Sequence, residues 1–211
     1  MDTQLVVLIV AGLLGYLLGS IPTAYIVVKR LAQKNILDWG TGNVGTLNTL
    51  RTTDSKLLTL LTMSGDMLKG LLAMALGVAI ARVAGQETGV VTITGGIFAV
   101  VGHNYSLFLR FRGGKGIATS VPVLFHLSPL LVAVWVGGFL LAVAGTRLLV
   151  LGQILGTLAV PIAAAFFLPG LFVPAGILAL LVFVRHAPRL RNVFNGTEPK
   201  LYYKVDKSPG S

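Results

Sequence analysis

Residues 102–119 of the chain read GHNYSLFLRFRGGKGIAT, a basic, glycine-rich turn between two apolar segments. Three cations and three glycines fall within residues 110–116. Glycines let successive backbone N–H groups point into one concavity, and Lys115 adds a full positive charge, so the turn is typical of a phosphate site. The Walker spacing is absent. The alternative is a charged loop that anchors two membrane helices on the cytoplasmic side.

The composition is that of a polytopic membrane protein. Of the 211 residues, 55% are hydrophobic and 11% are charged, whereas soluble domains carry about 25% charged residues. The net charge of +10 suits anionic lipid headgroups and an anionic substrate better than nucleic acid in such a chain. Without cysteine there is no disulfide, thiolate metal site or thiol nucleophile. We expect a monomer that needs no metal and no cofactor.

Seven apolar runs predict an all-α membrane protein with seven transmembrane segments. A helix of about 20 apolar residues crosses the hydrocarbon core, and the fourth run is shorter than that. We predict one polytopic domain over residues 1–198 and a polar tail over residues 199–211. The seven runs cover approximately residues 5–28, 57–84, 90–109, 117–126, 129–145, 148–168 and 171–184.

The cations predict the orientation. Every Lys and Arg except Lys69 and Arg82 falls in loops, turns or the tail on one predicted side. By the positive-inside rule that side is cytoplasmic, which puts the N-terminus outside and the C-terminus inside. We therefore expect a multi-pass membrane protein with its functional site facing the cytoplasm.

A second polar block lies on the same predicted side, at residues 39–51. It reads WGTGNVGTLNTLR and is rich in hydrogen-bond donors. If a helix begins at Val44, Asn48 and Arg51 share a face, and the first amides of that helix offer a second anion site. The alternative is an ordinary loop rich in turn residues.

Three of the ionisable residues that lie within the apolar runs are candidates for a role in the site. Asp66 and Lys69 are spaced for an internal ion pair, which is our leading interpretation, and a direct substrate contact by Lys69 is the alternative. His103 precedes the basic turn; as a lone histidine it is typical of a packing residue bonded to the backbone, but its closeness to Lys115 favours a role in the site. No hydrolase elbow or zinc motif is present.

Taken together, these blocks resemble the bacterial membrane-integral, acyl-phosphate-dependent glycerol-3-phosphate acyltransferases, the PlsY family. The resemblance covers about residues 12–200, and its order of blocks is more specific than any one block. The matching residues are Leu18-Gly19-Ser20-Ile21-Pro22, Gly40 to Gly45 with Asn48 and Arg51, Asp66 with Lys69-Gly70, Gly102-His103, Phe111 to Thr119, Arg185-His186, and Gly196 with Glu198.

The resemblance implies that an acyl group passes from acyl phosphate to glycerol 3-phosphate in a bacterial cytoplasmic (inner) membrane. The expected partners are the two substrates and membrane lipids, and no nucleic acid. It implies catalytic roles for Thr41, His103, Lys115 and Arg51. Gly113, Gly114 and Lys115 would hold the acyl phosphate, while Thr41, Asn48 and Arg51 would hold the other substrate. The full set implied to bind substrate is Asn43, Asn48, Arg112, Gly113, Gly114, Gly116, Lys69, His186, Arg189, Asn192 and Glu198.

The chain departs from the family pattern at several of these positions. Thr41 and Arg112 replace a serine and a lysine, and Val150 stands where a serine is usual. At Arg189 and Asn192 the usual asparagine and arginine have exchanged places. The alternatives to an acyltransferase are a divergent paralogue with another acceptor or no activity, and a small transporter or lipid-binding protein that grips phosphate.

Overall fold

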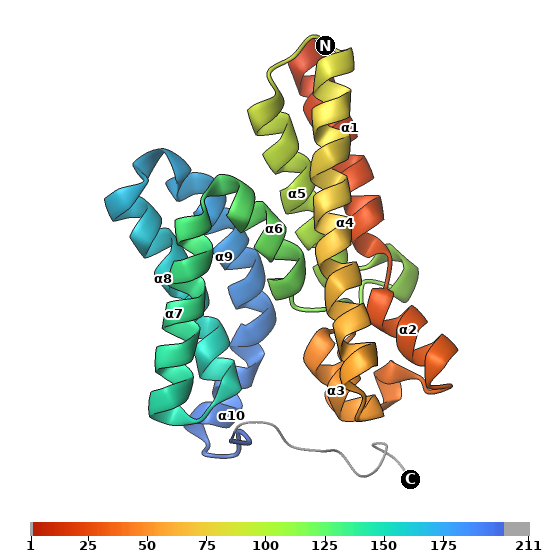
Figure 1. The fold of residues 1–211 in the computed structure, drawn as a ribbon, viewed down its shortest axis with the longest axis vertical. Coiled ribbons are helices and arrows are strands. Elements are labelled where there is room, and N and C mark those ends of the chain that lie inside the picture. The colour runs from red at the N-terminus through yellow and green to blue at the C-terminus, as the bar shows by residue number, and fades with distance from the viewer. Residues whose placement is uncertain (1, 201–211) are drawn as a thin grey trace. The chain divides into compact units, whose positions relative to one another are not determined.

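The computed structural model describes residues 2–200, and within that range the secondary structure consists of ten α-helices and four short 3-10 helices (Figure 1). The described chain divides into two compact units, residues 2–123 and 124–200, and the boundary lies inside helix α6 (Ile117–Leu127). Most of the predicted polar tail, residues 201–211, lies outside the described residues. The single domain predicted for residues 1–198 stays a prediction.

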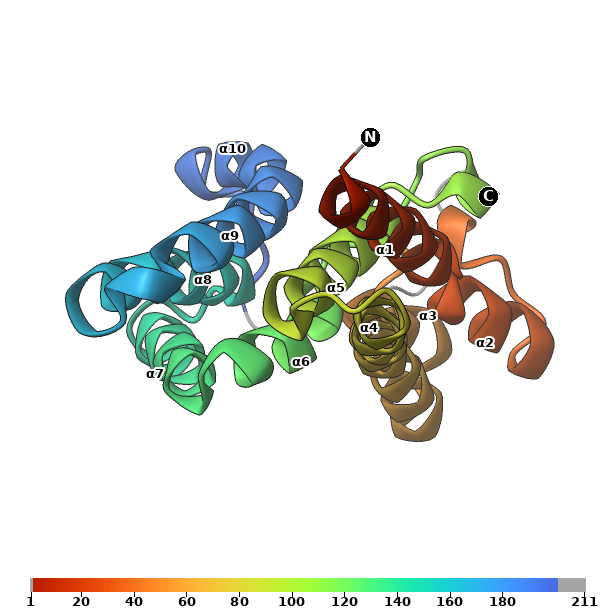
Figure 2. The same ribbon diagram turned by 90° about the horizontal axis from the view of Figure 1, so that it is seen from above.

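Three helices lie side by side in the N-terminal unit: α1 (Thr3–Ser20), α4 (Lys56–Val83) and α5 (Thr88–Asn104) (Figures 1 and 2). Gly15 of α1 lies so close to the carbonyl of Gly95 in α5 that a Cβ atom would overlap it. On α4, a Cβ at Gly77 would lie 2.9 Å from the carbonyl of Val91. Small residues let membrane helices approach closely, and here they bring three helices together.

The first apolar run, predicted over about residues 5–28, is divided between two helices and does not form a single one. Helix α1 ends at Ser20, and α2 (Thr23–Leu31) begins after Ile21-Pro22. Proline lacks an N–H group and disfavours the helical conformation in the residue before it, which explains the break. Helix α2 packs instead on the loop that follows it, through a buried apolar cluster of Ala24, Val28, Ile36 and Val44.

The rest of the N-terminal unit is a polar connection between α2 and α4. It contains the 3-10 helix η1 (Ile36–Asp38) and helix α3 (Thr46–Thr53), which packs on α4. Helix α3 begins two residues later than Val44, because Gly45 takes the cap position with an extended backbone. After α5, the 3-10 helix η2 (Leu107–Leu109) leads into the basic turn.

In the C-terminal unit α8 (Leu149–Phe167) packs on both α7 (Pro129–Thr146) and α9 (Phe172–His186). The indole Nε1 of Trp135 donates to the Thr157 hydroxyl across 3.2 Å and links α7 to α8. The unit also contains the 3-10 helices η3 (Pro169–Leu171) and η4 (Ala187–Arg189) and the short helix α10 (Leu190–Phe194). The α-helices break at residues 147–148 and 168–171, close to the ends of the apolar runs predicted over residues 129–145, 148–168 and 171–184.

Five helical stretches of the described chain are long and apolar enough to cross a membrane. Helix α6 has only 11 residues, which confirms the short fourth segment. Helix α4 has 28 residues, about 42 Å at 1.5 Å per residue, but it carries Asp66 and Lys69 and is not among the five. The predicted seven crossings and the predicted orientation stay predictions. The five stretches are Thr3–Leu31, Thr88–Leu109, Pro129–Thr146, Leu149–Phe167 and Pro169–Phe194.

Candidate active site

Asn48 holds the loop before α3 in shape. Its Oδ1 accepts from the Thr41 amide at 3.0 Å, and its Nδ2 faces the carbonyl oxygens of Ile36, Trp39 and Asn43 at 3.3, 3.0 and 2.9 Å. The side chain is buried, and both of its polar atoms are engaged by the backbone. Asn48 therefore acts on the site by fixing where the exposed Thr41 and the half-buried Asn43 lie.

Arg51 follows Asn48 by three residues on α3 and is 7% exposed. Helix α3 is tied to α4 by a hydrogen bond between the hydroxyls of Thr49 and Thr62, which lie 3.2 Å apart. Thr49 also donates to the carbonyl of Gly45, at the start of the helix. These bonds fix the helix that carries Arg51 against one face of α4.

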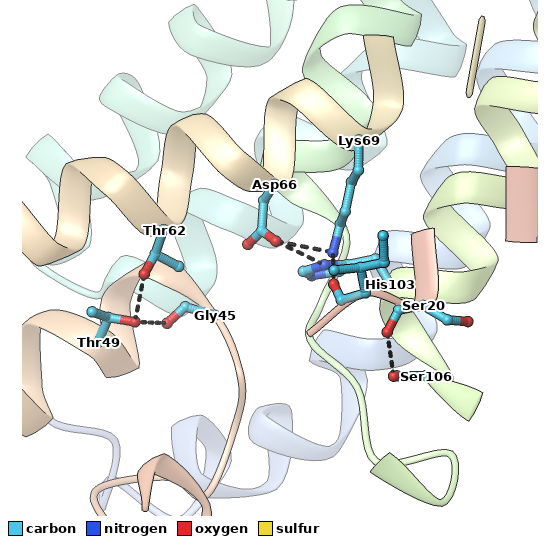
Figure 3. A network of polar contacts seen from close by, with 9 residues as sticks. Ser20, Gly45, Thr49, Thr62, Asp66, Lys69, His103 and Ser106 are labelled. Carbon is cyan, nitrogen blue, oxygen red and sulfur yellow. Dashed lines mark hydrogen bonds and ion pairs between the residues drawn. The ribbon is translucent and has the colours of Figure 1, made fainter. Parts of the chain in front are cut away.

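A buried cluster of charged residues joins α4 to α5 (Figure 3). The Nζ atom of Lys69 lies 2.9 Å from Oδ1 of Asp66, and the Nδ1 atom of His103 lies 3.5 Å from the same oxygen. Asp66, Lys69 and His103 are 1%, 5% and 5% exposed. The predicted ion pair between Asp66 and Lys69 is confirmed, and His103 joins it from the neighbouring helix.

The same cluster reaches the end of α1. The ammonium group of Lys69 donates to the main-chain carbonyl of Ile21 across 3.2 Å. Next to it, the hydroxyl of Ser106 donates to the carbonyl of Ser20 at 2.5 Å, and Tyr16 donates to the carbonyl of Tyr105 at 3.0 Å. The residues that follow α5 are thus held to the end of α1 by two hydrogen bonds.

The basic turn folds back onto the end of α5. The amide of Gly114 donates to the carbonyl of His103 at 2.8 Å, and the amide of Phe111 donates to the carbonyl of Ser106 at 2.7 Å. Gly113 and Gly114 are buried, whereas Lys115 is half-buried and Arg112 is exposed. A Cβ atom at Gly113 or Gly114 would overlap atoms of residues 103 and 104, so both positions require glycine.

One polar face of α4 connects the two blocks that the sequence singled out. Thr62, Asp66 and Lys69 are spaced by four and three residues and so lie on one side of the helix. Thr62 bonds α3, which carries Arg51, while Asp66 and Lys69 contact the end of α5 on which the turn rests. The structure thus joins the α3 block and the basic turn through α4. The two blocks and this face of α4 carry five cations: Arg51, Lys69, Arg110, Arg112 and Lys115.

The remaining predicted residues lie in the C-terminal unit. The Nδ1 atom of buried His186 is 2.8 Å from the carbonyl of Val182, one turn earlier. Arg189 binds the carboxylate of Glu198 through Nε and a terminal nitrogen, the first of these at 2.9 Å. The carbonyl of Asn192 accepts from the amides of Thr197 and Glu198 at 2.8 and 3.0 Å. Val150 is buried in α8.

Comparison with known proteins identifies the family. The sequence profile of glycerol-3-phosphate acyltransferase matches residues 9–196. The chain belongs to the glycerol-3-phosphate acyltransferase family. A family member from Clostridioides difficile is 36% identical over 200 residues, which cover 94% of this chain and 97% of that protein. A second, from Roseobacter denitrificans, is 38% identical over 207 residues and covers 96% and 98%.

The fold also matches a solved acyltransferase. A crystal structure of PlsY, described as an integral membrane glycerol 3-phosphate acyltransferase in its glycerol 3-phosphate form, superimposes with a TM-score of 0.77 and 27% identity. The superposition covers 92% of this chain and 95% of the PlsY chain. The lysophosphatidic acid form gives a TM-score of 0.72 and 28% identity. The family resemblance inferred from the sequence is confirmed, and with it the place of the family in phospholipid biosynthesis.

Several residues of this candidate site were not singled out by the sequence. Thr49 and Thr62 join α3 to α4, and Ser106 joins the end of α5 to α1. Asn104 is fully buried, and its Oδ1 would lie 2.8 Å from a Cβ placed on Gly116. The available signal was the four-residue spacing of Thr62 and Asp66 within an apolar run. Within residues 2–200 no group of three or more His, Cys, Asp or Glu side chains is placed to hold a metal ion.

Proposed function

We propose that the protein transfers an acyl group from acyl phosphate to the 1-hydroxyl of glycerol 3-phosphate. The hydroxyl oxygen bonds to the acyl carbon, the bond from that carbon to the phosphate oxygen breaks, and the released phosphate takes up the hydroxyl proton. The products are 1-acyl-glycerol 3-phosphate, or lysophosphatidic acid, and inorganic phosphate. Family membership and the likeness to PlsY in its glycerol 3-phosphate and lysophosphatidic acid forms support this acceptor and this product.

The polar face of α4 is the observation that carries the proposal. It links a glycine turn suited to one phosphate with a helix that carries Arg51. In the proposal the turn of Gly113, Gly114 and Gly116, with Lys115 and Arg112, holds the acyl phosphate, and Thr41, Asn43 and Arg51 hold glycerol 3-phosphate. His103 orients the turn, Asn48 shapes the loop, and Lys69 contributes positive charge.

This arrangement suits the chemistry of an acyl phosphate. A mixed anhydride is already activated, and phosphate is a good leaving group. The protein then has to bind two anions, align the hydroxyl with the carbonyl and stabilise the charge that develops. The proposal extends to His186, Arg189, Asn192 and Glu198 on the resemblance alone, and it places the reaction at the cytoplasmic face of a bacterial inner membrane.

The test is phosphate release from palmitoyl phosphate by the purified protein, with and without glycerol 3-phosphate. We expect release to depend on glycerol 3-phosphate and to fall by tenfold or more in Lys115→Ala and Arg51→Ala, because a hydrogen bond to a charged group contributes about 1.5–3 kcal/mol. The matched control is Lys56→Ala, an exposed lysine at the start of α4.

Three results would overturn the proposal. Wild-type release no higher than that of Lys115→Ala would show that there is no transfer. Release of coenzyme A from palmitoyl-CoA, in place of phosphate from palmitoyl phosphate, would show another donor. Uptake of glycerol 3-phosphate into proteoliposomes without product would show a transporter.

A further inference from the structure

The proposed reaction gives Asp66 no role and uses Lys69 only for its positive charge. Asp66 and Lys69 contact each other at 2.9 Å, and neither exposes more than 5% of its surface. Ionisable groups inside an apolar helix are unfavourable and are found where they serve a function. The Asp66 carboxylate faces two groups, the Lys69 ammonium and the Nδ1 atom of His103, so its position bears directly on His103.

The opposite edge of the His103 ring faces the basic turn. A Cβ atom on Gly114 would overlap the Nε2 atom of His103, so this edge of the ring packs directly against the Gly114 backbone. The main-chain carbonyl of the same histidine accepts from the Gly114 amide at 2.8 Å. His103 therefore contacts the carboxylate through one nitrogen and the glycine turn through the other.

We propose that Asp66 and Lys69 are positioning residues, which orient His103 so that its Nε2 edge and its carbonyl form the surface on which Gly113 and Gly114 rest. A carboxylate can only accept, so it requires a proton on the Nδ1 atom that faces it and selects one orientation of the ring. The assignment of the turn to acyl phosphate rests on the proposed function, but the contact itself does not.

Lys69 in addition holds the Asp66 carboxylate in place. Its ammonium group bonds Asp66 and the carbonyl of Ile21, an atom at the end of a different helix. A carboxylate held only by His103 would be free to change rotamer, whereas one held by a cation that is itself anchored has one position. A buried ion pair often adds little to stability but can fix a conformation, which is the role assigned here.

The first test uses amide hydrogen exchange over residues 112–118 and needs no activity. Asp66→Leu/Lys69→Met replaces the pair with apolar residues of similar volume and removes the acceptor for His103. Asp66→Asn/Lys69→Met is equally uncharged but keeps an acceptor oxygen. We expect exchange to become about tenfold faster in the first variant and only about threefold faster in the second, which keeps the acceptor oxygen but loses the anchor that Lys69 supplies. Thr157→Val, which removes a buried hydroxyl from α8, is the matched control.

The exchange outcomes separate the alternatives. Unchanged exchange in both double variants would show that the pair does not support the turn, and the inference would fall. Equally fast exchange in both would show that charge and not orientation matters, and would also overturn it. Neither result would bear on whether the protein is an acyltransferase.

The second test is kinetic and applies if the acyltransferase activity is found. In the Leu/Met variant we expect the KM for palmitoyl phosphate to rise about tenfold, while the KM for glycerol 3-phosphate changes by less than about twofold. A general loss of folded structure would lower the active fraction and leave both KM values unchanged. Equal rises in the two KM values would contradict the inference.

Should the Leu/Met variant fail to fold, the wild-type protein decides the question. Nitrogen NMR of ¹⁵N-histidine-labelled protein, with the His103 signals assigned from a His103→Gln sample, reports which ring nitrogen carries a proton. We expect a protonated Nδ1. An Nδ1 without a proton would overturn the inference, because that atom would then present a lone pair to the carboxylate.

Discussion

The amide of Gly114 donates a hydrogen bond to the main-chain carbonyl of His103 across 2.8 Å, so the basic turn rests on the last residues of helix α5. The bond spans eleven residues and closes the loop that carries Arg110 and Arg112. It places Lys115 one residue beyond an anchored point of the backbone. The backbone of Lys115 is thus held next to the end of α5.

Gly114→Ala should abolish most of the activity. The new Cβ would overlap the His103 ring, so the turn has to move away from α5. Because a small displacement of positioning groups can lower a rate by about a hundredfold, we expect a loss of that order in palmitoyl phosphate turnover.

The matched control for that glycine is Gly137→Ala in α7, where a Cβ meets no atom within 4 Å. A glycine inside a helix is less stable than alanine by about 0.5–1 kcal/mol, so this variant should be fully active and slightly more stable. Equal activity in the two variants would show that the turn does not need its contact with His103.

Asn48→Asp should be as damaging as Asn48→Ala, although it is nearly isosteric. The Oδ1 atom would still accept from Thr41, but an oxygen would replace Nδ2 among the carbonyls of Ile36, Trp39 and Asn43. Each buried group left without a partner costs about 1–3 kcal/mol. We expect faster proteolysis within residues 36–45 and reduced activity in both variants.

Asn35→Ala is the control for this loop, since Asn35 is an exposed residue that only caps η1. It should leave proteolysis and activity close to wild type. A fully active Asn48→Asp protein would show that the three carbonyl contacts do not hold the loop.

Lys69→Met alone should destabilise the protein more than Asp66→Leu/Lys69→Met. The single change leaves a buried carboxylate without its cation, which costs about 3–5 kcal/mol, whereas an apolar pair of similar volume is often neutral or stabilising. Thermal unfolding in detergent, followed by protease sensitivity, measures the difference. Equal destabilisation by the single and double changes would mean that the two charges are not coupled.

Arg189→Asn/Asn192→Arg should retain more activity than either single change. Arg189 pairs with the carboxylate of Glu198, which is 5% exposed, and Arg189→Asn alone removes that partner. The amide of Glu198 bonds the carbonyl of Asn192 at 3.0 Å, so an arginine at position 192 lies near enough to replace it. We expect a loss of about tenfold for each single change and about threefold for the pair. Losses that simply multiply would show that the two positions act independently.

The long helices of this protein could be predicted because each is an apolar run of suitable length. The runs predicted at residues 129–145, 148–168 and 171–184 match α7, α8 and α9 to within two residues at each end. Their boundaries are marked by Pro129, Arg147 and Pro169-Gly170, which end or begin helices for local reasons. The Asp66–Lys69 pair was also predictable from local sequence, because two side chains three residues apart on one helix lie close together.

Contacts between distant segments were not predictable. Asn48 was expected to meet substrate, but the structure directs its side chain to four backbone groups of residues 36–43. His103 could be placed near the basic turn, but its contact with Asp66 depends on how α5 packs on α4, and that packing depends on glycines such as Gly77. The sequence shows which residues are polar, but the packing of the helices determines which of them are in contact.

The break between α1 and α2 has a meaning beyond the path of the chain. In an unbroken helix the carbonyl of Ile21 would be occupied by an amide one turn later; here it accepts from Thr23 at 3.0 Å and from the Lys69 ammonium at 3.2 Å. The carbonyl at the end of the interrupted helix thus gives the buried Lys69 ammonium a hydrogen bond of the kind that water gives an exposed lysine. Pro22 and Lys69 are thus two halves of one feature, and a protein that straightened the first helix would have to give up the charge in the fourth.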